Sequence, residues 1–169
     1  MTTLTSPDDL LAAIPFLIGY HPENSLVLVS LKQGQVGMAM RVDFPQDIAP
    51  ESYDLLASHI IREEASAVLI VAYISEEIVD PDPVLTNVCA ALVRAQIEIK
   101  ESLIVRGTRY RSMMCSDFSC CPPEGSEIPP LDTSRIAVEH VIAGHPMPFA
   151  NVDGLVQSIA ALPSSHDRA

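Results

Sequence analysis

Basic residues are scarce in this sequence. Its 169 residues include 10 lysines and arginines against 22 aspartates and glutamates, which gives a formal net charge of −12. Binding to nucleic acid or to an anionic membrane surface depends on basic residues that neutralise phosphate. The composition therefore disfavours both as partners.

Long apolar runs are lacking as well. No stretch approaches the roughly 18 to 20 apolar residues that cross a bilayer. The opening segment MTTLTSPDDLL carries acidic residues where a secretory signal needs positive charge. We therefore expect a cytoplasmic protein.

The motifs of the common nucleotide-binding and hydrolase sites are also missing. Seven glycines are present, and they form neither a G-x-G-x-x-G fingerprint nor a P-loop. The sequence contains no G-x-S-x-G nucleophile elbow and no H-E-x-x-H zinc motif. Because no catalytic set is complete, the sequence leaves open whether the protein is an enzyme.

Apolar residues are plentiful enough to build a core. They make up 48% of the chain and charged residues 19%, as in globular domains. A chain of this length suits one domain. We predict a single layered α/β domain over residues 1–163 and a frayed C-terminal tail over residues 164–169.

Two β-hairpins are predicted. Residues 26–31 are aliphatic and residues 36–44 alternate, with the turn KQGQ between them. The alternation places Arg41 and Asp43 together on one face, opposite Val36, Met38, Met40, Val42 and Phe44. The second hairpin turns at Gly107-Thr108, with glycine where a positive φ is required.

The remaining segments predict helices and one buried strand. Residues 67–74 are apolar throughout, which is typical of a central strand covered on both faces. The first predicted helix begins after a Ser6 cap and ends near Ile14, because Pro15 follows. The second runs from Pro50 to about Glu64, and the third follows the apolar stripe from Leu85 to Ile99. The fourth runs from an Asp132 cap to about Ala143, and the fifth from about Val152 to Leu162. Together these elements predict a mixed sheet of about five strands, with two hairpins and flanking helices.

Three of the four cysteines crowd one proline-rich loop. Cys115, Cys120 and Cys121 could hold a zinc ion, with a fourth ligand from Asp117, His140 or His145. Alternatively, Cys115 forms a disulfide with one of the other two, or all three are reduced thiols that pack the loop. Cys89 lies in a predicted helix beside its apolar stripe and is expected to be a small buried hydrophobe.

Polar side chains gather at two further places. Arg106, Arg109 and Arg111 share one face of the second hairpin and could bind an anion, or could pair with Glu98, Glu101 or Glu124. The segment His21-Pro22-Glu23-Asn24-Ser25 precedes a strand, so its side chains are expected at a sheet end, where ligands often bind. His21 and Glu23 could act as a base and its partner, or simply form a turn. Arg41 and Asp43 form an ion pair or help to orient a ligand.

Three segments resemble one known family. They are DLLAAIPFLIGYHPENSLVLVSL (9–31), MRVDFP (40–45) and ESLIVRGTRYRSMMCSDFSCCPPEG (101–125). They are similar, in this order, to motifs of the actinobacterial domain of unknown function 4192 family (DUF4192), whose members are often longer at the C-terminal end. The resemblance implies no established activity, but it directs attention to the matching positions: Pro15, Gly19, Pro22, Ser25, Arg41, Asp43, Arg109, Ser112, Cys115, Asp117, Cys120, Cys121, Glu124 and Gly125.

Three functions remain open from the sequence. The first is a non-enzymatic binding domain that recognises an acidic small molecule or a protein partner through the arginine and cysteine region. The second is a thiol-based redox protein or enzyme that uses the cysteine loop, with nearby arginines lowering a thiol pKa. The third is a zinc module in which the metal orders the loop. A homodimer is a further expectation.

Overall fold

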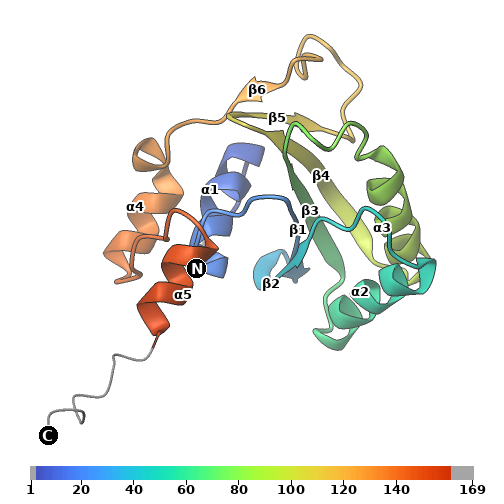
Figure 1. Cartoon of the computed structure of the whole chain (residues 1–169), viewed down its shortest axis with the longest axis horizontal. Helices are drawn as coiled ribbons and strands as arrows, with labels where there is room; N and C mark the ends of the chain where they lie inside the picture. The colour runs from blue at the N-terminus through green and yellow to red at the C-terminus, as the bar shows by residue number, and fades with distance from the viewer. Residues whose placement is uncertain (1–2, 161–169) are drawn as a thin grey trace, which may run out of the picture.

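A six-stranded sheet runs through the molecule, with helices on both faces (Figure 1). The computed structural model describes residues 3–160. The strands follow the order β2-β1-β3-β4-β5-β6; β3 and β4 are parallel, and every other neighbouring pair is antiparallel. Their bounds are β1 (Ser25–Lys32), β2 (Gln35–Asp43), β3 (Ala67–Ile74), β4 (Glu98–Arg106), β5 (Arg109–Ser112) and β6 (Ser126–Glu127). The predicted mixed sheet with two hairpins is confirmed, and the two-residue β6 is added to it.

The helices form layers on either side of this sheet. One face is covered by α2 (Pro50–Arg62) and α3 (Asp82–Arg94), and the other by α1 (Pro7–Ile18). A 3₁₀ turn (Leu131–Thr133) leads into α4 (Arg135–Ile142), which packs on the outer side of α1. The last described helix, α5 (Val152–Ile159), follows Phe149, which is hydrogen-bonded to Gly19 and His21 just after α1. Within residues 3–160, no helix is long and apolar enough to cross a membrane.

The central strand is β3, as predicted. It lies between β1 and β4, and its side chains alternate between two apolar clusters. Val68, Ile70 and Ala72 face α2 and α3, whereas Leu69 and Val71 face α1. Burial on both faces explains why the sequence of this strand is apolar without alternation.

The first helix continues through Pro15, so its predicted end near Ile14 is wrong. Pro15 is buried inside α1, and the helix ends at Gly19, which has a φ of 90° and donates its N–H to the Pro15 carbonyl at 2.8 Å. A proline inside a helix costs about 3 kcal/mol, while burying one leucine or isoleucine side chain contributes about 1.5 to 3 kcal/mol. Leu10, Leu11 and Ile14 are all buried on this helix. Tertiary packing therefore outweighs the local penalty.

A bulge in β2 overturns the predicted position of Val36. Val29 pairs with Ala39 and Leu31 pairs with Val36, so β2 holds one more residue than β1 between these pairs. Val36 consequently packs on the α1 face, while Met38, Met40 and Val42 pack on the α2 and α3 face. The predicted placement of Arg41 opposite these methionines is retained.

Two other helix boundaries differ from the predictions. Helix α3 ends at Arg94, and Gln96 adopts a φ of 59°, so Ile99 lies in β4 and not on the helical stripe. The cap of α4 is Ser134, whose Oγ accepts the Ile136 N–H at 3.2 Å; Asp132 lies in the 3₁₀ turn before it. The predicted tail over residues 164–169 and the predicted end of the last helix lie outside the described residues.

Candidate functional site

The sheet separates the predicted site residues into two groups. Ser25, Arg41 and Asp43 lie at the β1–β2 side, whereas the arginine hairpin and the cysteine loop lie at the β5–β6 side, with β3 and β4 between them. Segments 9–31 and 40–45 meet where Arg41 donates to Ser25, and segments 9–31 and 101–125 meet where His21 and Gly107 line one cleft. Within the described residues, segments 40–45 and 101–125 share no cleft, so the three segments do not form a single site.

The first group is a hydrogen-bonded chain centred on Ser25. The buried Ser25 hydroxyl donates to the Glu23 carbonyl at 2.6 Å and accepts from Arg41 Nε at 2.7 Å. Arg41 Nη1 also pairs with Asp43 at 2.8 Å, and Asp43 is exposed. The predicted Arg41–Asp43 neighbours thus form an ion pair, and Arg41 ties the segment before β1 to strand β2. A ligand role for these residues stays a prediction.

Arg106, Arg109 and Arg111 share one face, as their spacing predicted. Arg106 pairs with Arg109 across the hairpin, and Arg111 lies two residues further along β5. Arg106 donates to the Ser75 and Ile78 carbonyls, both at 2.9 Å, and Arg109 donates to the Gly125 carbonyl at 2.6 Å. Two of the three guanidinium groups therefore fasten loops to the sheet.

The surroundings of these arginines are acidic. They line a cleft of about 560 Å³ together with Glu76, Asp80, Asp82 and Glu124. Two of the predicted partners bind elsewhere, because Glu98 pairs with Lys100 at 2.6 Å and Glu101 accepts from the Ser112 hydroxyl at 2.7 Å. Carboxylates beside the guanidinium groups weaken the attraction for an incoming anion.

The cysteine loop brings three sulfur atoms together. The Sγ atoms of Cys115, Cys120 and Cys121 lie within 4.8 Å of one another, and those of Cys120 and Cys121 are 3.8 Å apart. One turn causes this convergence: the Asp117 carbonyl accepts the N–H groups of Cys120 at 3.1 Å and Cys121 at 2.7 Å. All three cysteines are free thiols.

Cys115 and Cys121 shift the pKa of each other's thiol. A hydrogen bond with Cys121 lowers the pKa of Cys115, and the same contact raises the pKa of Cys121 to about 12. Cys115 therefore ionises before Cys121. The expected activation of a thiol by the arginines is not what the structure shows, because the contacts that lower this pKa come from within the loop.

The residues expected to supply a fourth metal ligand do not converge on these sulfurs. Asp117 Oδ1 accepts both the N–H and the hydroxyl of Ser119, at 2.9 and 2.7 Å. His140 stacks on Phe16 with ring centroids 4.6 Å apart, and its ring is 5.2 Å from that of His145. Among the described residues, the metal-ligating group contains the three cysteines alone.

Cys89 packs against the core as predicted, but it is not fully buried. It is half-buried on α3, where it packs against the apolar cluster beneath this helix. Burial raises the pKa of its thiol. It is therefore unlike the three loop cysteines in both position and chemistry.

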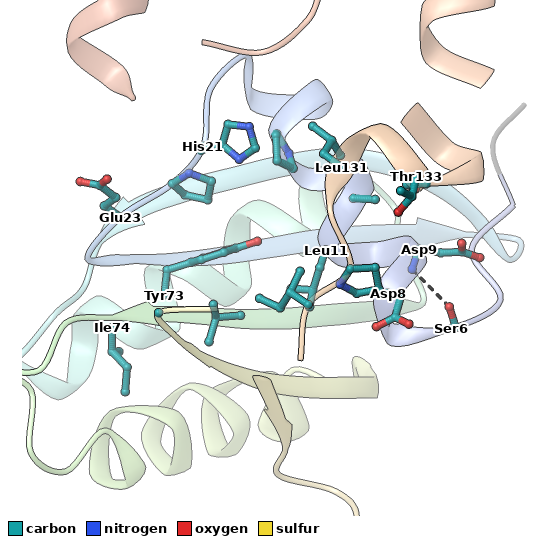
Figure 2. A pocket seen from close by; sticks show the side chains of 18 of the residues that line it. Ser6, Asp8, Asp9, Leu11, His21, Glu23, Tyr73, Ile74, Leu131 and Thr133 are labelled. Carbon is teal, nitrogen blue, oxygen red and sulfur yellow. Dashed lines mark hydrogen bonds between the residues drawn. The ribbon is translucent and has the colours of Figure 1, made fainter. Parts of the chain in front are cut away.

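A further large cleft was not predicted from the sequence. It has a volume of about 690 Å³ and opens at the carboxyl ends of β3 and β4, beside α1 (Figure 2). His21 and Glu23 line it, which confirms that this segment lies at a sheet end; no hydrogen bond joins their side chains. Burial lowers the pKa of His21. The sequence analysis missed Asp8 and Tyr73, and the only signal for Tyr73 was a phenol in an otherwise aliphatic strand.

Fold and site together define a mixed α/β domain that carries a loop with three converging thiols beside an open sheet edge. The chain belongs to the domain of unknown function family DUF4192, whose pattern matches residues 7–169. The resemblance noted from the sequence motifs is thereby confirmed over nearly the whole chain. No curated protein matches the chain.

Proposed function

We propose that this domain binds a zinc ion through Cys115, Cys120 and Cys121. The observation that carries the proposal is the convergence of the three sulfur atoms within 4.8 Å. Thiolates are strong ligands for zinc, and a loop with little secondary structure gains order when a metal joins its ends.

The sulfur spacing fits a metal better than a covalent bond. Zinc–sulfur bonds of about 2.3 Å in tetrahedral geometry place two sulfur atoms about 3.8 Å apart. The Cys120 and Cys121 sulfurs have a separation of 3.8 Å. A disulfide needs about 2.05 Å, so oxidation would require the loop to move.

The proposed site has three protein ligands and an open fourth position. Structural zinc sites usually have four protein ligands, whereas sites that bind or transform a small molecule usually have three. Among the described residues no histidine or carboxylate joins the group of three sulfurs, so water or an external ligand would complete the site. The proposal is therefore a binding site that accepts an exchangeable ligand.

A redox role of the same loop is the second candidate. It is favoured by the lowered pKa of Cys115, which makes this thiol the nucleophile toward an external disulfide. Attack of Cys115 would form a mixed disulfide and release one thiol, and Cys120 or Cys121 would then displace the second thiol to close an internal disulfide. Recognition of an acidic ligand or of a protein partner at the arginine face would depend mainly on the exposed Arg111, because Arg106 and Arg109 hold backbone carbonyls.

The test is metal binding by the reduced protein. We expect one zinc ion per chain by elemental analysis, and thiolate-to-metal charge-transfer absorption when cobalt replaces zinc. Cys115→Ser, Cys120→Ser and Cys121→Ser should each weaken zinc binding at least tenfold in competition with a chromophoric chelator. The matched control is Cys89→Ser, which should bind zinc like the wild type.

Two results would overturn the zinc proposal. One is zinc binding that Cys89→Ser weakens as much as the loop variants do. The other is a reduced protein that takes up no zinc but, once exposed to air, loses two protons by mass and two titratable thiols. The second result would favour the redox candidate.

A further inference from the structure

The large cleft on the α1 side has the location and size of a ligand site. It is bounded by the ends of β3 and β4, the first turns of α1 and the segments 21–24 and 128–135 (Figure 2). Ligands of α/β proteins commonly bind at the carboxyl ends of parallel strands, and β3 and β4 are the parallel pair. Its volume of about 690 Å³ is sufficient for a small organic molecule.

Tyr73 extends from the end of β3 into this region and directs its hydroxyl toward α1 (Figure 2). The hydroxyl oxygen is buried and has no hydrogen-bond partner among the described residues. Burial raises the pKa of Tyr73 well above its ordinary value, so the group remains a neutral hydroxyl. A buried polar group without a partner is uncommon and indicates a missing partner.

Asp8 provides a second polar group without a partner on the opposite wall. It lies in the first turn of α1, and its Oδ1 is buried without a hydrogen bond from any described residue. Its neighbour Asp9 is fully engaged, since Asp9 Oδ2 accepts from Thr5 and, at 2.9 Å, from Arg135. Asp8 also lies beside the Tyr110 hydroxyl, and burial together with this carboxylate raises the pKa of Tyr110 to about 12. Asp8 Oδ1 is therefore the carboxylate oxygen that is left for a ligand.

The charge of the lining favours a cation. Three carboxylates, from Asp8, Asp9 and Glu23, face one guanidinium, from Arg135. That guanidinium already pairs with Asp9 and Glu139, so little of its charge is left for a ligand. The lowered pKa of His21 keeps the imidazole neutral near pH 7.

The rest of the lining is largely apolar. Leu11, Ala12, Val105 and Leu131 form walls between the polar groups. We propose that the cleft binds a small organic cation, a protonated amine on an apolar body, with the amine donating to Asp8 and a polar group of the body pairing with the Tyr73 hydroxyl. This site is separate from the cysteine loop, so it does not depend on the proposed zinc site.

Tyramine and tyrosol provide a matched pair of probes, because they share a phenol and differ in an amine versus a hydroxyl. Amide chemical shifts report binding in the full chain, and shifts at Gly107 and Thr133 locate it in the cleft. We expect tyramine to bind at least tenfold more tightly than tyrosol. Asp8→Asn should remove this preference, and Tyr73→Phe should weaken both probes several-fold.

The control variant is Asp153→Asn, which removes an exposed carboxylate on α5 with the same change of charge. It should bind both probes like the wild type, and thermal melts confirm that each variant is folded. The proposal is overturned if tyrosol binds as tightly as tyramine, if Asp153→Asn has the effect of Asp8→Asn, or if millimolar tyramine shifts no cleft amide. The tyramine titration is repeated with the Cys115→Ser variant, which lacks one proposed zinc ligand. Because the cleft is separate from the cysteine loop, this variant should bind tyramine like the wild type, so the two proposals are tested independently.

Discussion

The buried polar side chains of this protein differ in whether they have hydrogen-bond partners. The Ser25 hydroxyl is completely buried, yet it both donates and accepts a hydrogen bond, so its burial has a structural explanation. The Tyr73 hydroxyl and Asp8 Oδ1 are buried with no such partners. An unpaired buried polar group costs about 1 to 3 kcal/mol. Ser102 Oγ and His140 Nε2 are also buried without a partner, so what sets Tyr73 and Asp8 apart is that both line the same cleft.

His140 is the residue for which we predict a pH effect on stability. Burial lowers its pKa, His145 lowers it further and Glu139 opposes the shift. Because the folded pKa lies below the unfolded value, the unfolded chain binds the proton more readily. The stabilising contribution is therefore complete above the unfolded pKa of about 6.5 and is lost as the pH falls through the folded pKa.

A His140→Phe variant tests this effect. Phenylalanine keeps a ring against Phe16, with which His140 stacks, but cannot bind a proton. Between pH 7.5 and about pH 5, urea unfolding should show a larger loss of stability for the wild type than for the variant. Parallel losses would mean that this imidazole contributes nothing to the pH dependence.

At the scale of the elements, the β2 bulge depends on Gly37. A Cβ atom at this position would lie 2.6 Å from Ser30 Oγ, and Ser30 Oγ itself accepts the Met38 N–H at 2.8 Å. We predict that Gly37→Ala destabilises the protein by about 1 to 3 kcal/mol, the usual range for overpacking. Chemical denaturation of the purified variant measures the change.

A second substitution distinguishes this clash from a general intolerance of alanine. In a Ser30→Ala background the clashing oxygen is gone, and the nearest side-chain atom, Ser30 Cβ, is 3.9 Å away. Gly37→Ala should then cost clearly less than it does in the wild type, with a coupling energy of about 1 kcal/mol or more. Equal costs in the two backgrounds would refute the proposed clash.

Elements with a clear hydrophobic pattern were predictable from the sequence. Irregularities whose position depends on a single contact or backbone angle were not. The apolar run of β3, the two hairpins and helix α2 follow from patterns of hydrophobicity and turn residues. The bulge in β2 depends on Ser30, eight residues from the N–H that it accepts. The end of α3 depends on Gln96 adopting a φ of 59°, which the residue type does not favour.

At the scale of the whole molecule, the three cysteines were predicted and the cleft was not. Cys115, Cys120 and Cys121 are close in sequence, so a single turn can bring them together. The cleft combines α1, the end of β3 and the segment 128–135, which are distant in sequence and meet only when the sheet is assembled. Its key side chains, Asp8 and Tyr73, carry no local signal that separates them from a helix-start acid and a strand aromatic.

The distance of the cysteine loop from the core predicts how the molecule would respond to removal of the proposed zinc ion. Both apolar clusters of the sheet form without the loop cysteines, and the sheet strands β1, β3 and β4 are held by their own ladders. The loop itself is exposed for much of its length and has few backbone hydrogen bonds. Such a segment opens at low free energy, whereas core strands exchange only on global unfolding.

We therefore expect a chelator to act on the loop and not on the fold. Removal of zinc from the loaded protein should speed amide exchange across residues 115–125 by at least tenfold and leave the amides of Val27, Val71 and Leu103 protected. The Cys89→Ser protein should respond in the same way, and Cys120→Ser should show fast loop exchange even with zinc present. Loss of protection in β3 on chelation would contradict this prediction, because it would make the metal a requirement for the sheet and the protein a zinc-dependent fold.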